Sequence, residues 1–219
     1  MIPLPQGVPP IPERDDVPLL AAEPVAESAG PGLRFPGRSL VLVAGLPGAG
    51  KSTLLARLYG MRGDESEPVR AGRVHVIDSR QARNWWARRL RPLPPRAQIP
   101  FIYTTHVLRI VRALTAGHPV VAHTRGTWAH LLYGLAWLAR RHDTSLHLVL
   151  IDVPPEIARA GQVARGRVLT TVAFARHCRR WDRLVARARA GAVPPADTVT
   201  VLDRAAADRL PGIDFGPQG

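Results

Sequence analysis

The sequence predicts an α/β fold in which a five-stranded parallel sheet is flanked by helices on both faces. Two observations predict it. Short, continuous apolar runs alternate along the chain with segments of helical length, as expected for parallel strands joined by helical crossovers. The first run, SLVLVAG at 39–45, leads into a glycine-rich loop, and leucines at helical spacing follow that loop. We therefore expect the loop at an edge of the sheet, between a buried strand and a helix.

The other four strands are predicted from similar apolar runs, at 73–78, 119–124, 146–152 and 197–203. Apolar residues at helical spacing predict helices at 80–91, 101–114, 128–141 and 171–190, with a short helix after 203. A further helix is expected to begin at Pro154-Pro155-Glu156, because proline fits the first turn and a carboxylate there suits the helix dipole. The proline-rich segment 92–95 is expected to end the helix before it.

The two ends of the chain differ in composition from the middle. Residues 1–36 contain nine prolines and show no sustained apolar period, which predicts a disordered leader. A single folded domain is expected over 37–210, since 219 residues bury one sizeable core. The glycine- and proline-containing residues 211–219 are expected to form a flexible tail.

Composition also limits the function classes. The net charge is +13 although the first 36 residues are acidic on balance, so the rest is strongly basic. Such a charge favours phosphorylated ligands, nucleic acid or another anionic partner. No apolar run reaches the roughly 18 residues of a membrane span. A single cysteine, Cys178, excludes an intrachain disulfide framework. We therefore expect a cytoplasmic protein.

The glycine-rich loop, GLPGAGKST, matches the pattern G-x-x-x-x-G-K-[ST]. Small residues let backbone N–H groups surround a phosphate, and the helix that follows points its positive end at the same anion. In this pattern Lys51 reaches the β- and γ-phosphates, and Ser52 coordinates Mg²⁺. The predicted nucleotide-binding residues are Gly45, Leu46, Pro47, Gly48, Ala49, Gly50, Lys51, Ser52 and Thr53.

Lys51 is the one lysine in a chain whose other basic residues are arginines. An ammonium is compact, whereas a planar guanidinium would crowd a backbone already closed around phosphate. Lysine is thus found at the one position where a compact cation fits the phosphate-binding loop better than arginine. Without a second lysine the chain lacks an N/T-K-x-D-like guanine-reading segment, which favours ATP over GTP.

Asp78 and Ser79 follow the second predicted strand, at the sheet edge where open α/β folds bind ligands. Three roles for Asp78 are compatible with this position. It could accept a proton from a substrate hydroxyl, it could hold Mg²⁺ through water, and it could cap the next helix. The sequence leaves these three roles open.

Several basic and aromatic residues admit both a functional and a structural interpretation. Arg165 and Arg167 could form a mobile lid that balances charge on a transferred phosphoryl group, or belong to a solvated basic loop. A second set could contact the acceptor or pack in the core: Trp85, Trp86, Arg88, Arg89, Tyr103, His106 and Arg109. His123 and His130 lack partners at metal spacing and are interpreted as structural.

With these motifs, the segment 39–203 resembles the small P-loop kinase-like ATP-binding proteins, a group that includes zeta toxins, polynucleotide kinases and chloramphenicol phosphotransferase. The resemblance is carried by GLPGAGKST, by Asp78 and by the run LIDVPPEIARAGQVARGR at 150–167. It implies a three-layer P-loop NTPase fold with a 2-3-1-4-5 strand order. It also implies ATP and Mg²⁺ as cofactors, and transfer of the γ-phosphoryl group to a hydroxyl.

Two positions depart from that group. Many P-loop enzymes end the strand beside the loop with a carboxylate that orients the magnesium shell, whereas the third strand here ends Ala122-His123-Thr124. Polynucleotide-kinase-like enzymes often place an arginine three residues after the aspartate, where this chain has Gln81. The leading hypothesis is a phosphotransferase acting on a small or nucleotide-like hydroxyl acceptor, in which Lys51 stabilises charge and Asp78 acts as the base. The alternatives are a nucleotide-dependent switch or slow ATPase that docks a partner, and a nucleic-acid-binding ATPase.

Overall fold

The computed structural model describes residues 32–124, 129–166, 169–191 and 195–217. Within these residues, six strands form the central sheet in the order β3-β4-β5-β2-β6-β7. Their bounds are β2 (Ser39–Gly45), β3 (Val69–Ala71), β4 (Val74–Ile77), β5 (Val120–His123), β6 (Ser145–Ile151) and β7 (Thr198–Leu202). Every residue of β2 is buried, as expected for the middle of a sheet that is covered on both faces.

Strands β4, β5, β2, β6 and β7 run parallel, which confirms the predicted parallel sheet and its 2-3-1-4-5 order. The expected number of strands was one too low, because β3 adds an antiparallel edge strand through a tight turn at Gly72. Its three residues have no apolar run that marks a strand in the sequence. The register aligns Val41 with Val121 and with His147 on its two neighbours.

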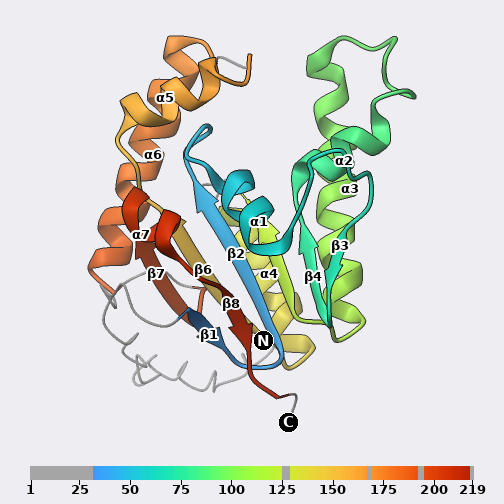
Figure 1. Cartoon of the computed structure of the whole chain (residues 1–219), viewed down its shortest axis with the longest axis vertical. Coiled ribbons are helices and arrows are strands. Elements are labelled where there is room, and N and C mark those ends of the chain that lie inside the picture. Colours follow the sequence, from blue (N-terminus) through green and yellow to red (C-terminus); the bar gives the residue numbers. More distant parts are fainter. Residues whose placement is uncertain (1–31, 125–128, 167–168, 192–194, 218–219) are drawn as a thin grey trace, which may run out of the picture.

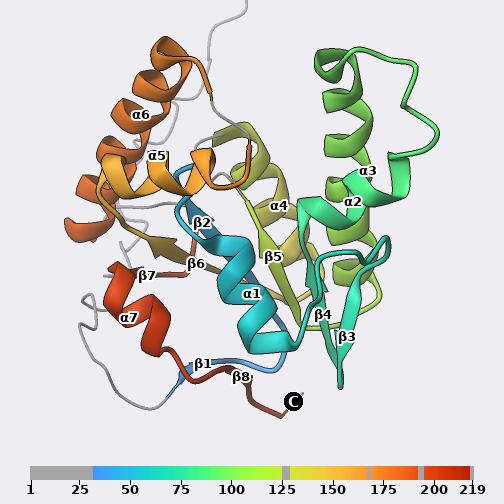
Figure 2. The same ribbon diagram turned by 45° about the horizontal axis from the view of Figure 1, so that its top comes forward.

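Helices cover both faces of the sheet (Figures 1 and 2). On one face lie α1 (Lys51–Tyr59) and α7 (Arg204–Arg209), and on the other lie α3 (Pro95–Thr115) and α4 (Ala129–Arg141). Of the other helices, α2 (Ser79–Trp86) packs on α3, and α6 (Thr171–Arg189) packs along β7. The short α5 (Pro155–Val163) precedes α6. This three-layer arrangement confirms the predicted fold class.

The boundaries between 79 and 115 differ from those predicted. Helix α2 ends at Trp86, not at residue 91. Helix α3 begins at Pro95, six residues before the predicted start, and contains Pro100. The proline-rich segment therefore both separates the helices and starts the second one, because Pro95 occupies a first-turn position where no amide hydrogen bond is lost.

The expected leader and tail both overlap ordered structure. Strands β1 (Leu33–Phe35) and β8 (Ile213–Phe215) pair in parallel as a separate two-stranded sheet. Phe35 and Ile213 are buried in the main core, so the domain extends beyond 37–210 at both ends. Three-residue strands beside prolines carry too little pattern to be found from sequence. Residues 1–31 of the expected leader, and 218–219 of the expected tail, lie outside the described residues.

Spanning a bilayer takes a helix of roughly 20 mainly apolar residues. Among the described residues, no helix is long and apolar enough to cross a membrane.

Candidate functional site

The glycine-rich loop connects β2 to α1, as predicted. Gly48 and Gly50 have φ values of 94° and 93°, a region that side chains rarely adopt. A Cβ atom on Gly48 would also overlap the carbonyl oxygen of Ala158 in α5. On the same side, the Gln162 amide donates a 2.9 Å hydrogen bond to the carbonyl of Pro47. Helix α5 therefore fixes the loop, and glycine is required at its closest approach.

Lys51 begins α1 and is only 5% exposed. Its ammonium donates hydrogen bonds to the carbonyl oxygens of Gly45, at 2.7 Å, and Leu46, at 2.8 Å. These bonds hold the positive charge against the loop backbone. A buried cation at the start of a helix, beside a loop of small residues, is an arrangement suited to an anionic group.

Asp78 lies between β4 and α2 and is 2% exposed. It caps α2: its carboxylate accepts the backbone N–H of Arg80 at 2.7 Å, while the Gln81 side chain accepts the N–H of Asp78 at 3.1 Å. The hydroxyl of Ser52 also acts on this carboxylate and helps to lower its pKa. Gln81, at which this chain departs from the polynucleotide-kinase pattern, thus completes the cap of α2.

His123, at the end of β5, lies 3.4 Å from Asp78 between Nδ1 and Oδ1. Strand β5 lies between β4 and β2, so His123 ends the strand between the one that leads to Asp78 and the one that leads to the loop. Burial raises the pKa of Asp78, but the hydrogen bond and charge of His123, the Ser52 hydroxyl and the Arg80 N–H outweigh it. Together they hold the pKa well below its usual range, so Asp78 is ionised at neutral pH.

A cavity of about 120 Å³ begins beside this cluster and extends between α3 and α4. One part of its wall is polar and includes Ser79, His123 and Thr124. The larger part is aliphatic and is formed by Ile99, Ile102, Ile110, Leu131 and Leu135. His106, from α3, also lines it, and its Nε2 donates to the carbonyl oxygen of His123 at 2.8 Å. Burial lowers the pKa of His106 to about 4.

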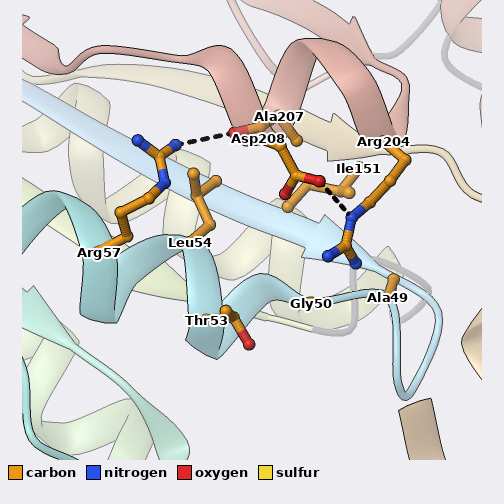
Figure 3. Close-up of a pocket in the computed structure, with 9 residues that line it drawn as sticks. All are labelled: Ala49, Gly50, Thr53, Leu54, Arg57, Ile151, Arg204, Ala207 and Asp208. Carbon is orange, nitrogen blue, oxygen red and sulfur yellow. Dashed lines mark hydrogen bonds and ion pairs between the residues drawn. The ribbon is translucent and has the colours of Figure 1, made fainter.

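A second cavity, of about 210 Å³, lies beside the loop, between α1 and α7 (Figure 3). Gly50, Thr53 and Ile151 contribute to its wall. Charged side chains surround it: Arg204 pairs with Asp208 at 2.7 Å, and Arg57 donates to the Ala207 carbonyl at 2.9 Å. Loop residues thus line this second cavity, whereas the first is lined by α2, α3, α4 and the end of β5.

The structure brings one of the two predicted lid arginines to the loop. The exposed Arg165 donates a 2.7 Å hydrogen bond from its guanidinium to the hydroxyl of Thr53. Gly166 follows it with a positive φ of 61°. Arg167, the other predicted lid residue, lies outside the described residues.

The remaining candidates divide between core and surface. Trp86 packs against the small cluster of Ala82, Leu90 and Ile102 and donates to Thr105 at 2.8 Å, as the core interpretation predicts. Arg88 and Arg89 are exposed, and Arg109 pairs with Glu67 at 2.9 Å. Tyr103 and His106 line the cavity, as does His123, which was expected to be structural. The strand order implied by the resemblance could have placed His123 between Asp78 and the loop.

The described residues contain no cluster of three or more His, Cys, Asp or Glu side chains that could hold a metal ion alone. The paired oxygens of Ser52 and Asp78 nevertheless suit Mg²⁺, which prefers hard oxygen ligands and takes most of them from phosphates and water. These two residues fit the metal that the loop implies.

Comparisons with known proteins agree with this architecture. A family model described as AAA domain, AAA_33, matches residues 40–191. The PezAT chromosomal toxin-antitoxin structure from Streptococcus pneumoniae aligns with a TM-score of 0.50 and 16% identity, over 79% of this chain and 76% of that chain. A gluconokinase structure from Sinorhizobium meliloti 1021 aligns with a TM-score of 0.47 and 14% identity, over 80% and 89% of the two chains. No curated protein matches the sequence. The loop, the strand order and the extent of the family match together show that the chain belongs to the AAA_33 family and has a P-loop kinase-like fold.

Proposed function

We propose that this protein is an ATP-dependent phosphotransferase that moves the γ-phosphoryl group to a hydroxyl of a small acceptor. One observation carries the proposal: the Ser52 hydroxyl of the loop helix helps to lower the pKa of Asp78, and Asp78 contacts His123, which lines the aliphatic cavity. The residues proposed to bind phosphate and metal thereby adjoin a separate cavity, the one between α3 and α4. A transferase needs two such neighbouring sites, one for the donor and one for the acceptor.

The nucleotide is expected to lie along the loop with its phosphates on the backbone N–H groups and on Lys51. The charged cavity between α1 and α7 then takes the base and ribose, because it adjoins Gly50 and Thr53 at the start of α1. When bound through Ser52 and Asp78, Mg²⁺ supplies positive charge that offsets the charge of the β- and γ-phosphate oxygens. Lys51, Ser52 and Asp78 are proposed to fix the position of the donor nucleotide relative to the acceptor cavity.

Asp78 is proposed to hold the magnesium shell rather than to act as a strong base. Its pKa is lowered and its carboxylate is already shared among Ser52, Arg80 and His123, so its affinity for a proton is small. Phosphoryl transfer through a loose transition state needs little base strength before the bond to phosphorus forms. Asp78 would thus replace the carboxylate that is missing at the end of β5, and would accept the hydroxyl proton late in the transfer.

Arg165 is proposed to act from the lid. Its contact with Thr53 places a guanidinium beside the first turn of α1. From there a small movement of the segment after α5 could bring its charge to the transferred group, and Arg167 is proposed to share this role.

The alternative, a nucleotide-dependent switch or slow ATPase, is favoured by a different observation. Strand β5 ends in His123 where many P-loop enzymes have a carboxylate. If this difference weakens transfer, ATP would be bound and slowly hydrolysed. The basic composition alone favours a nucleic-acid-binding ATPase, and binding that ignored sequence and vanished at moderate salt would mark that contact as nonspecific.

Incubation with γ-labelled ATP and a pool of small metabolites distinguishes these functions. We expect label in an organic product, and we expect Asp78→Asn to reduce its formation roughly 100-fold. Asparagine is as good a helix cap as aspartate, so the variant should fold normally. Label found in inorganic phosphate alone would favour the ATPase, and transfer unaffected by Asp78→Asn would remove the proposed role of Asp78.

A further inference from the structure

The buried wall of the aliphatic cavity contains a hydrogen-bond acceptor that no described residue satisfies. His106 is only 5% exposed and lines the cavity. Its Nε2 lies 2.8 Å from the carbonyl oxygen of His123, whereas Nδ1 has no partner among the described residues. Leaving a buried polar atom unsatisfied is costly, so such an atom at a cavity wall points to a ligand.

The tautomer of His106 follows from its known partner. A carbonyl oxygen only accepts hydrogen bonds, so Nε2 must carry the proton that it donates to His123. In the neutral ring, Nδ1 then has a free lone pair and no proton. Burial keeps this ring neutral by lowering its pKa to about 4. The cavity therefore offers a fixed acceptor and requires a donor from whatever occupies it.

The other lining side chains narrow the class of occupant. The guanidinium of Arg83 and the absence of any Asp or Glu side chain from this described lining disfavour a cationic amine. A carboxylate has no proton to donate to Nδ1 at neutral pH, and a charged phosphate would be costly to bury against a mostly aliphatic wall. The aliphatic majority of the wall favours a ligand with a compact apolar body.

We propose that Nδ1 of His106 binds a neutral hydroxyl of the acceptor, and that the acceptor is a compact alcohol or phenol with an apolar body. This inference deepens the proposed phosphotransferase function and rests on it. His106 acts here as a binding residue that selects and orients the acceptor, and it transfers no proton. A site built around one buried acceptor discriminates strongly against analogues that lack the donor.

Phenol and benzene form a matched pair of probes for this site. The cavity of about 120 Å³ is close in size to an apolar cavity of about 150 Å³ that binds benzene. We expect phenol to bind the wild-type protein about tenfold more tightly than benzene, as one net hydrogen bond predicts. Titrations followed by NMR of ¹⁵N-histidine-labelled protein should also shift the Nδ1 resonance of His106 with phenol only.

Two substitutions separate the binding role of His106 from its structural role. His106→Gln keeps an amide N–H near the Nε2 position, where it bonds the His123 carbonyl, but removes the Nδ1 acceptor. His106→Asn keeps an acceptor near the Nδ1 position and loses the bond to His123. A purely structural role predicts that the glutamine variant is the milder one. Our proposal predicts the opposite order for the preference for phenol over benzene. The glutamine variant should lose this preference, and the asparagine variant should keep part of it. His142→Gln, away from the cavity, serves as the control.

Equal affinities of phenol and benzene for the wild type would overturn the proposal. A phenol preference that His106→Gln retains would also overturn it, as would binding of neither probe. These readouts need no ATP, so they fail independently of the phosphotransferase function. If phenol selectivity depends on His106 while ATP does not bind, the proposed function fails and the hydroxyl site stands.

Discussion

The two cavities differ in how they would recognise a ligand. The cavity between α1 and α7 is bordered by loop backbone and by the ion pair of Arg204 with Asp208. The cavity between α3 and α4 is mostly aliphatic and has its polar atoms on one side. Loop backbone and charged side chains suit the proposed nucleotide, with its phosphates along the loop and its base and ribose in the cavity, whereas shape and one buried acceptor suit selection among similar small molecules. We infer that nucleotide binding and acceptor choice are built from separate residues.

The largest expected effect separates the two regions. Lys51→Ala removes a buried ammonium that faces the loop, and we expect ATP affinity to fall roughly 100-fold because a charged hydrogen bond is lost. Phenol binding in the other cavity should not change. Calorimetry with both ligands measures the effect, and Lys51→Arg tests whether charge without the compact shape restores affinity. Unchanged ATP binding in Lys51→Ala would refute the assignment of this loop to nucleotide.

The pH dependence of stability is expected to come from buried histidines away from the loop. Burial lowers the pKa of both His106 and His147 to about 4, below the ordinary value of 6.5. The unfolded chain therefore binds protons more readily than the folded one between these values. Their contribution is complete above pH 6.5 and is lost as pH falls towards 4, by up to about 1.4 kcal/mol per pH unit for each histidine.

Urea unfolding between pH 4 and 8 measures this slope. His106→Gln should reduce this slope by the contribution of one histidine, while the contribution of His147 remains. The lowered pKa of Asp78 adds to the loss of stability only in more acidic solution, because an ordinary aspartate titrates near 3.8. A stability that does not change between pH 6.5 and 4.5 would contradict the assignment of neutral, buried rings.

The contrast between the cavities also explains what the sequence could predict. The nine residues from Gly45 to Thr53 are contiguous, so their phosphate chemistry is visible as a local pattern. Continuous apolar runs likewise predicted the five parallel strands, because a central strand is buried on both faces. The aliphatic cavity instead combines side chains from α2, α3, β5 and α4, and no local pattern marks it.

Other features were missed for related reasons. Strands β1, β3 and β8 have three residues each, too few for a periodic pattern, and β1 and β8 gain their stability from pairing across the whole chain. Asp78 was identified from its place after a strand, but its interaction with Ser52 depends on how two separate strand ends are arranged. Contacts of this kind can be predicted only once the order of the strands in the sheet is known.

A substitution at Gly48 tests whether α5 shapes the nucleotide side. We expect Gly48→Ala to destabilise the fold by about 1–3 kcal/mol and to weaken ATP binding, since it meets both a positive φ and the Ala158 carbonyl. Gly60→Ala is the matched control, because Gly60 also has a positive φ, of 64°, but has open space around it. Urea unfolding of both variants isolates the packing effect. Equal losses would show that backbone strain alone accounts for the requirement.

The smallest effect is expected at Arg165, because its side chain is exposed and solvent screens its charge. Arg165→Ala should lower the rate of transfer at saturating ATP about tenfold while changing ATP affinity little, since the proposed lid acts mainly in the transition state. Arg165→Lys keeps the charge but loses the planar fork that contacts Thr53. Its transfer rate should therefore lie between those of the wild type and of Arg165→Ala. An unchanged rate would leave Arg165 on a solvated basic loop. A loss of phenol selectivity would mean that the lid also closes the acceptor cavity, and that the two regions are coupled.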